Sequence, residues 1–372
     1  MLVYIIAAAI LFLGVILRQG TAFYWTGYAF LFIITVFRDP VLGATDTIIY
    51  QDFFHSIPPI SDIMDYDSKY TLGYTLLSSL VKQFSDEFVD FQFVYGVITF
   101  YLLNKILQKL ALNYHERCFF LLSYFAFRFI WNQWIILRQN IAELFFWLIL
   151  IELYSILKET NGDTRKDSGI HLYNRAKIVA LLVLSILVPA LFHTSAFFNI
   201  PLLMGMFLFH KMKPKYVFGL TVVLSILCMI GSQSLFSTLF GWASSFDTRY
   251  EMYETNADSG QNILNTLFKF IFFMVFVLHY NKEWYPKKRF VLDTMAVTCI
   301  LSSINVEIMI RMYEYYAIGF YTLMAIFLHN FSNHRIVVAM VVSSVLLIIL
   351  IRFLFIFDGG SFINYSFWPT VF

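Results

Sequence analysis

IVVAMVVSSVLLIILIRFLFIF, residues 336–357, carries one charged residue, Arg352, in an otherwise apolar or small-residue stretch. A helix of about 20 apolar residues is long enough to cross the roughly 30 Å hydrocarbon core of a bilayer. In water, a helix that is apolar on all sides would need a partner on every face. The stretch therefore predicts a transmembrane helix.

Apolar blocks of this kind recur along the whole chain. The sequence is 59% hydrophobic and only 13% charged, whereas about a quarter of a typical soluble domain is charged. We therefore expect residues 1–372 to form a single all-α, polytopic membrane domain of about twelve (11–13) transmembrane helices. The predicted spans are 1–17, 21–37, 71–104, 118–135, 139–157, 177–192, 195–210, 216–233, 264–281, 290–306, 312–328 and 336–357.

Two of the apolar stretches need to be divided. The acidic sequence SDEFVD interrupts 71–104, which predicts a short surface helix followed by one span. Pro189 and Pro201 interrupt 177–210, and His193 lies between them. Because irregular backbone is not tolerated in contact with lipid, we expect two spans joined by a tight turn there.

The orientation follows from the lysines and arginines of the connections between spans. Basic residues favour cytoplasmic loops, and one set of alternate connections holds most of them. This set places both termini on the non-cytoplasmic side. Its members are Arg18, Lys105, Lys109, Arg117, Lys158, Arg165, Lys166, Arg175, Lys177, Lys211, Lys213, Lys215, Lys282, Lys287, Lys288, Arg289 and Arg335.

The opposite, outer set contains few cations, and four arginines among them attract attention. Arg38 ends the second span, Arg138 opens the fifth, Arg311 opens the eleventh, and Arg249 lies in an acidic connection. An arginine at membrane depth usually faces a cavity, and its planar guanidinium binds phosphate in a bidentate manner. The four therefore predict a site for a lipid-linked diphosphate, covered by the outer connections 38–70 and 234–262.

Plainer explanations apply to each arginine taken alone. A single arginine at a helix end often extends its guanidinium to the membrane surface. Arg138 has the carboxylate of Glu143 nearby, and Arg311 has Glu307 and Glu314 at helical spacing for local ion pairs.

Two residues are candidates for activating a hydroxyl group. His193, in ALFHTSAFF, titrates near neutral pH when unperturbed and suits a base or a phosphate ligand, although a histidine in a turn is often structural. Asp46 follows Arg38 closely, although loop carboxylates are usually only solvated. No HExxH, CxxC or phosphate-binding glycine loop occurs, so we expect no metal and no cofactor.

Four segments resemble the EpsG family of bacterial exopolysaccharide proteins, which is similar to the Wzy-type polysaccharide polymerases. They are FRDPVLGATDTIIYQDFF (37–54), ILRQNIAELFFWLIL (136–150), LFHTSAFFNIPLL (191–203) and RMYEYYAIGFY (311–321). The resemblance implies a fold like that of GT-C membrane glycosyltransferases. The positions that match its motifs are Arg38, Asp46, Arg138, His193, Arg311 and Tyr315. Where the family often has a Glu-Pro-Gly-like turn, this chain has KYTLGYTLL and retains only Gly73 and Tyr74.

The resemblance implies an enzyme of the bacterial inner membrane. It would be a metal-independent glycosyltransferase that joins undecaprenyl-diphosphate-linked oligosaccharide repeats at the outer leaflet into exopolysaccharide, capsule or O-antigen. A chain-length regulator and a flippase would be its partners, and nucleic acid would not.

Two other functions fit the sequence less well. A flippase or transporter should show repeated halves and charges near the bilayer midplane, whereas here the charges favour one face. An outer-face acyltransferase that modifies the polymer would also use a histidine, but it would need fewer arginines.

Overall fold

The computed structural model of the chain is helical throughout the part that it describes. That part comprises residues 1–17, 19–63, 65–162, 168–244, 263–280, 285–304, 307–328, 331 and 334–367. Within these ranges, extended backbone pairs at one isolated antiparallel bridge, between Arg38 and Phe367. The chain divides into two compact units, a first unit of Met1–Ala196 with Phe331–Phe372 and a second unit of Phe197–Asn330.

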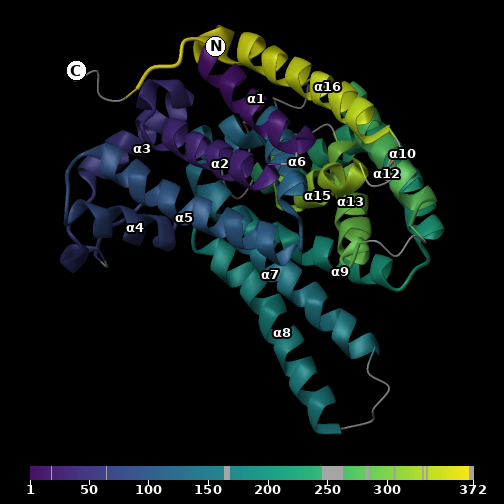
Figure 1. The fold of residues 1–372 in the computed structure, drawn as a ribbon. Helices are drawn as coiled ribbons and strands as arrows, with labels where there is room; N and C mark the ends of the chain where they lie inside the picture. Colours follow the sequence, from purple (N-terminus) through teal and green to yellow (C-terminus); the bar gives the residue numbers. More distant parts are fainter. Residues whose placement is uncertain are drawn as a thin grey trace. The chain divides into compact units, whose positions relative to one another are not determined.

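The first unit is built around helices from both ends of the chain. α1 packs on α2, α6 and α16, so the first and last of its helices lie side by side (Figure 1). α7 packs on α5 and forms a hairpin with α8. The helices of this unit are α1 (Leu2–Ile16), α2 (Gly20–Val36), α3 (Ala44–Ser56), α4 (Leu72–Lys82), α5 (Phe88–Lys109), α6 (Tyr114–Tyr124), α7 (Leu137–Gly162), α8 (Ser168–Ala190) and α16 (Arg335–Ile356).

The connection from α6 to α7 is unusual. Two π-helical segments, η3 (Phe125–Phe129) and η4 (Trp131–Ile135), follow α6. The helical path then breaks at Ile136 (φ −99°, ψ 52°), and α7 begins at the next residue. Segments of π-helix are rare and occur often at functional sites.

The second unit packs around α13. This helix contacts each of the other five described helices of the unit, and most of its side chains from Phe290 to Leu301 are buried. The helices are α9 (Asn199–His210), α10 (Pro214–Ser244), α12 (Ile263–Leu278), α13 (Lys288–Ser302), α14 (Glu307–Tyr316) and α15 (Ile318–Phe327).

Apolar side chains cover the outside of several helices. Within the described residues, three helical stretches are long and apolar enough to cross a membrane, Leu137–Leu157, Pro214–Gly231 and Arg335–Ile356. The first is 67% buried within the protein, but the other two are only 17% and 28% buried. Exposed apolar surface of this size is costly in water, so these two helices are the faces that a bilayer would cover.

The helices agree with most of the predicted spans. The 71–104 stretch divides into α4 and α5, and 177–210 divides into α8 and α9 with a turn between them, as expected. Each predicted span overlaps a helix, whereas the number that cross a membrane stays a prediction. Two differences concern the outer connections: 38–70 contains the helix α3, and α10 continues to Ser244, past the predicted end at 233.

Candidate functional site

Arg138 lies in the first turn of α7, directly after the break at Ile136. Its guanidinium carbon is 4.1 Å from the centre of the Tyr70 ring and 5.8 Å from that of Tyr50. The side chain is half-buried, and its Nε has no hydrogen-bond partner in the described part of the chain. Aromatic faces attract a cation without neutralising it, so Arg138 keeps its charge and its donors for another group.

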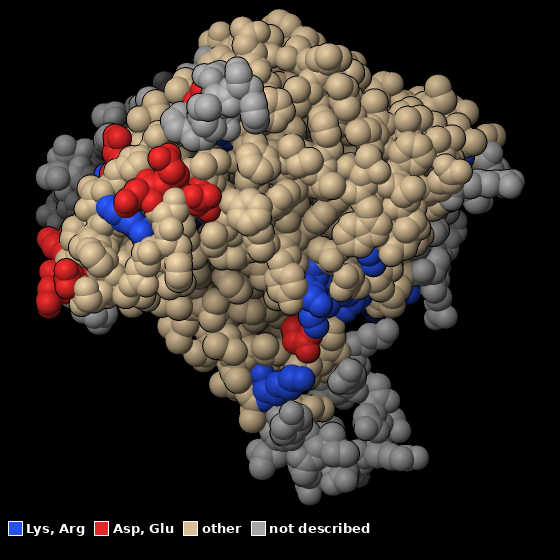
Figure 2. Space-filling model, turned by 60° about the vertical axis from the view of Figure 1, so that its left-hand side comes forward, with Lys and Arg blue, Asp and Glu red and all other residues tan. Residues whose placement is uncertain are grey.

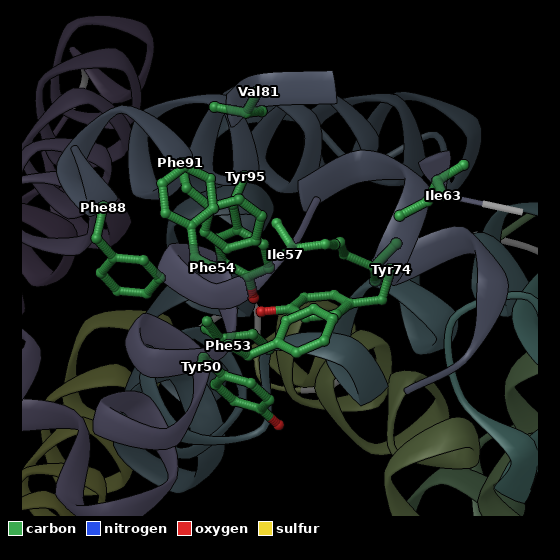
Figure 3. Packing of buried hydrophobic residues seen from close by; sticks show 12 residues of the cluster. Tyr50, Phe53, Phe54, Ile57, Ile63, Tyr74, Val81, Phe88, Phe91 and Tyr95 are labelled. Carbon is green, nitrogen blue, oxygen red and sulfur yellow. The ribbon is translucent and has the colours of Figure 1, made fainter. Parts of the chain in front are cut away.

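Three tyrosines form the surface beneath Arg138. Tyr50 from α3, Tyr70 from the connection before α4 and Tyr74 from α4 have ring centres 5.5–5.8 Å apart; we call them the tyrosine triad. Two of them, Tyr50 and Tyr74, belong to a buried cluster formed mainly by α3, α4 and α5 (Figure 3). Buried rings that pack this closely have few alternative rotamers, so Tyr50 and Tyr74 support the half-buried ring of Tyr70 under Arg138.

Asp46 lies near the same surface. It is exposed in the first turn of α3, one helical turn before Tyr50. Burial raises the pKa of Tyr70 to about 12; the neighbouring Arg138 lowers this pKa, and Asp46 raises it. Both residues therefore lie near enough to influence one hydroxyl group, and a shared catalytic role for Arg138 and Asp46 stays a prediction.

The turn that carries His193 is fastened to the start of α4. Thr71 Oγ1 donates a hydrogen bond to Phe192 O (2.6 Å), and Gly73 N donates one to Leu191 O (2.7 Å). A Cβ atom on Gly73 would lie 2.7 Å from that same oxygen, so the close approach requires glycine. Phe192 also packs against the aromatic cluster, which puts His193 at the edge of the same region as the tyrosine triad.

The contacts at Nδ1 of His193 favour one tautomer. Ser195 N–H donates to His193 Nδ1 (3.2 Å), and Ser195 Oγ lies 2.6 Å from the same nitrogen. A ring nitrogen that accepts a hydrogen bond carries no proton, so the neutral imidazole has its proton on Nε2. In this form His193 is a hydrogen-bond donor at Nε2.

Arg38 is enclosed by protein. It is 1% exposed, donates from Nη2 to Trp134 O (2.9 Å), and lies 5.7 Å from the Trp134 ring centre. Its backbone pairs with Phe367 near the chain's end. Burial lowers the pKa of Arg38 to about 10, so the group stays charged at neutral pH. Among the described residues, its Nε and Nη1 have no partner.

A buried polar network behind Arg138 is absent from the predicted site. Asn132 Nδ2 and Gln139 Nε2 donate to the two carboxylate oxygens of Glu143, at 3.0 and 2.7 Å. Asn140 Nδ2 donates to the Tyr95 hydroxyl (2.7 Å). Each oxygen of Glu143 therefore accepts a hydrogen bond from an amide. The available sequence signal was the polar letters WNQW and RQN at the junction of two apolar spans.

The second unit holds the other predicted residues. Arg311 is half-exposed on α14, and Tyr315, one turn later, is buried. The nearby α12 contributes Lys269, a buried cation that the sequence reading missed, 4.4 Å from the centre of the Tyr313 ring. Arg249 lies outside the described residues. A common cavity for Arg311 and Arg138 therefore stays a prediction.

Acidic and basic side chains lie on different parts of the surface. On the face drawn in Figure 2, acidic side chains gather around α3 and α4, and basic side chains gather near the α7–α8 hairpin. Within the described ranges, no three His, Cys, Asp or Glu side chains are grouped as metal ligands. The sidedness of the chain stays a prediction.

Comparison with known protein families identifies a family model that matches the chain. The model of the EpsG family matches residues 3–159 and 169–367, nearly the whole chain. No curated protein and no solved structure matches the chain.

Proposed function

Because the chain belongs to the EpsG family, a family of Wzy-type polysaccharide polymerases, we propose that it joins lipid-linked oligosaccharide repeats into a polysaccharide. The proposed donor is a growing glycan on undecaprenyl diphosphate, and the acceptor is a hydroxyl group of another lipid-linked repeat. The product is an exopolysaccharide, a capsule or an O-antigen. The reaction takes place at the outer leaflet of the bacterial inner membrane.

The surroundings of Arg138 carry this proposal. Arg138 is only half-buried and rests on two aromatic rings at 4.1 and 5.8 Å, and this arrangement supports binding of an anion. Its fork of donors suits the oxygens of a phosphate. A residue that served only to cap a helix or reach the surface would not need this aromatic support.

The proposed reaction is a glycosyl transfer without a metal. The acceptor oxygen bonds to the anomeric carbon of the donor glycan while the bond from that carbon to the diphosphate breaks. The acceptor proton passes to a base, and undecaprenyl diphosphate leaves. Arg138 stabilises the charge that develops on the leaving group, usually the largest catalytic term; Arg38, Arg249, Arg311 and Tyr315 contribute to binding the diphosphate and the glycan.

Asp46 and His193 divide the remaining tasks in this proposal. Asp46 is exposed beside the Arg138 surface and accepts the proton of the acceptor hydroxyl. His193 has its proton on Nε2 because Nδ1 accepts from Ser195, and this arrangement suits donation to a glycan or phosphate oxygen. The opposite assignment, with His193 as base, requires the other tautomer.

The test is chain elongation by purified protein in proteoliposomes supplied with undecaprenyl-diphosphate-linked repeats. Wild-type protein is expected to produce a ladder of longer glycans, with chelator present or absent. Arg138→Ala should lower the rate by about 100-fold or more, and Arg138→Lys should fall between, since a lysine lacks the bidentate fork. Arg175→Ala, an exposed arginine on α8, is the matched control.

Other outcomes identify the rival functions. Movement of unlengthened repeats across the bilayer would indicate a flippase, and acyl transfer to a finished polymer would indicate an acyltransferase. Normal chain lengths from Arg138→Ala would remove Arg138 from the site.

A further inference from the structure

Because the helical backbone breaks between η4 and α7, small changes in the angle between these segments alter the orientation of Arg138. Ile136 has a non-helical conformation, and its N–H bonds back to Trp131 O (3.1 Å). On the other side, Asn140 N donates to Ile136 O (2.9 Å) and so closes the first turn of α7. Backbone bonds thus hold each side separately, and the angle between the two segments depends on side chains.

Glu143 connects the two sides. Its carboxylate accepts from Asn132, which belongs to η4, and from Gln139, which belongs to α7. All three side chains are at most 2% exposed, so water does not compete for these bonds. A carboxylate only accepts hydrogen bonds, so both amides must turn their nitrogen atoms toward Glu143.

A second bridge supports the first. Asn140 Nδ2 donates to the Tyr95 hydroxyl, and that hydroxyl donates to the backbone oxygen of Asn132 (3.4 Å). Tyr95 belongs to α5 and to the aromatic cluster under the tyrosine triad. The network therefore joins the break to the elements that support Arg138.

Arg138 lies on a different face of α7 from this network. Successive helical residues are about 100° apart, so the inward positions Gln139, Asn140 and Glu143 share one side, and Arg138 points away from it. Ring contacts constrain a guanidinium weakly in direction. The direction of the Arg138 guanidinium therefore depends on how firmly the hydrogen-bond network on the inward face holds α7 in place.

We propose that Glu143 is a positioning residue for the polymerase reaction: its carboxylate fixes the η4–α7 break and thereby directs Arg138 at the leaving diphosphate. The inference rests on the proposed function. It assigns Glu143 a task other than proton transfer or ion pairing with Arg138.

The main variant is Glu143→Gln, which keeps the shape and loses one acceptor. The new amide has one oxygen, which can accept from Asn132, but its nitrogen then faces the nitrogen of Gln139. The bridge to α7 is restored only if Gln139 reverses its amide, so we expect this bridge to be weakened. We expect turnover to fall roughly 10- to 100-fold, with a small change in the KM of the lipid-linked donor. Glu152→Gln, in a surface ion pair with Lys109 on the same helix α7, should keep wild-type turnover.

Exchanging the residue types at positions 139 and 143 should restore the network. In Glu143→Gln/Gln139→Glu, the new glutamine donates to position 139 and accepts from Asn132, so both bonds form again. We expect turnover and the melting temperature to return to near the wild-type values. Failure of the double variant to regain turnover would contradict the proposal, as would wild-type turnover in Glu143→Gln.

A double-mutant cycle tests whether Glu143 acts through Arg138. In an Arg138→Lys background, Glu143→Gln should lower turnover by less than about twofold, because coupled residues are not additive. An equal loss in both backgrounds would show a general folding role and overturn the inference. A wild-type protein that elongates nothing would instead reject the proposed function, so the two failures are distinguishable.

Discussion

Arg38 and Arg138 are both predicted to bind a diphosphate, but their surroundings differ. Arg38 is 1% exposed, donates to Trp134 O and lies beside the chain's last described residues. Arg138 is half-buried on the tyrosine triad and has an unpartnered Nε within the described chain. A cation on a partly open aromatic surface can take up an anion directly. An enclosed cation contributes mainly to the structure around it, so the proposed role of Arg38 in binding the diphosphate requires the surrounding chain to open.

Tyr70 provides a residue-scale prediction. Tyr70→Phe keeps the ring under Arg138 and should change kcat/KM for elongation by less than about threefold. Tyr70→Ala removes a cation–π contact of about 0.5–2 kcal/mol, so kcat/KM should fall roughly 2- to 30-fold. The comparison is made in the proteoliposome assay. If the phenylalanine and alanine variants lose activity equally, the hydroxyl and not the ring is the important part of Tyr70.

At the residue scale, the sequence indicated the ionisable residues of the site but not the residues that hold them in place. Arg138 stands out because cations are scarce on the predicted outer face, His193 because it lies in a turn between two spans, and Asp46 because it follows Arg38 closely. The tyrosine triad gave no such signal, since 20% of the chain is aromatic and tyrosines are ordinary at membrane surfaces. The contacts of Glu143 depend on the break at Ile136, and no residue type near it predicts a break in the helix.

Among the elements, the connection from α6 to α7 and the start of α4 determine the site. Hydropathy located α7, and the stretch from α6 through η4, to within about five residues, because blocks of apolar residues are the strongest signal in a membrane sequence. It missed α3, since ATDTIIYQDFFHS mixes polar and apolar residues among acidic neighbours. Long-range packing gives α3 its stability, through Tyr50, Phe53 and Phe54 in the buried cluster.

Gly73 provides the element-scale prediction. In Gly73→Ala the new Cβ would lie 2.7 Å from Leu191 O, the oxygen that accepts from Gly73 N. We expect a loss of about 1–3 kcal/mol in the free energy of unfolding, seen as a lower melting temperature in detergent, and weaker elongation because the His193 turn is displaced.

The control is a glycine with space around it. A Cβ atom added to Gly205 in α9 would meet nothing within 4 Å, so Gly205→Ala should be neutral or stabilise by about 0.5–1 kcal/mol. If Gly73→Ala melts like Gly205→Ala, the turn is not held in the way described.

For the molecule as a whole, the membrane assignment depends on where apolar side chains remain exposed. α10 and α16 show long apolar faces to their surroundings, whereas α7 is enclosed by other helices. Composition predicted this class of protein securely. The division into two units was not predictable, because it follows from contacts such as α16 on α1, between residues more than 300 positions apart.

Sidedness gives the prediction at this scale. With Cys228, the half-exposed free cysteine, replaced by serine, Asp52→Cys in α3 should react with a membrane-impermeant thiol reagent in intact cells. Lys213→Cys, between α9 and α10, should react only after the membrane is permeabilised. Both positions are exposed. The reverse pattern would place Arg138 and His193 in the cytoplasm and end the outer-leaflet proposal.

The pairing of residues 1–38 with residues 362–367 has a consequence for biosynthesis. Met1 N donates to Ile363 O, Tyr4 donates to Phe362 O, and Arg38 pairs with Phe367. A ribosome delivers the first partners of these bonds hundreds of residues before the second ones. The early helices must therefore form before residues 362–367 exist, and Arg38 gains its backbone partner only after those residues have been synthesised.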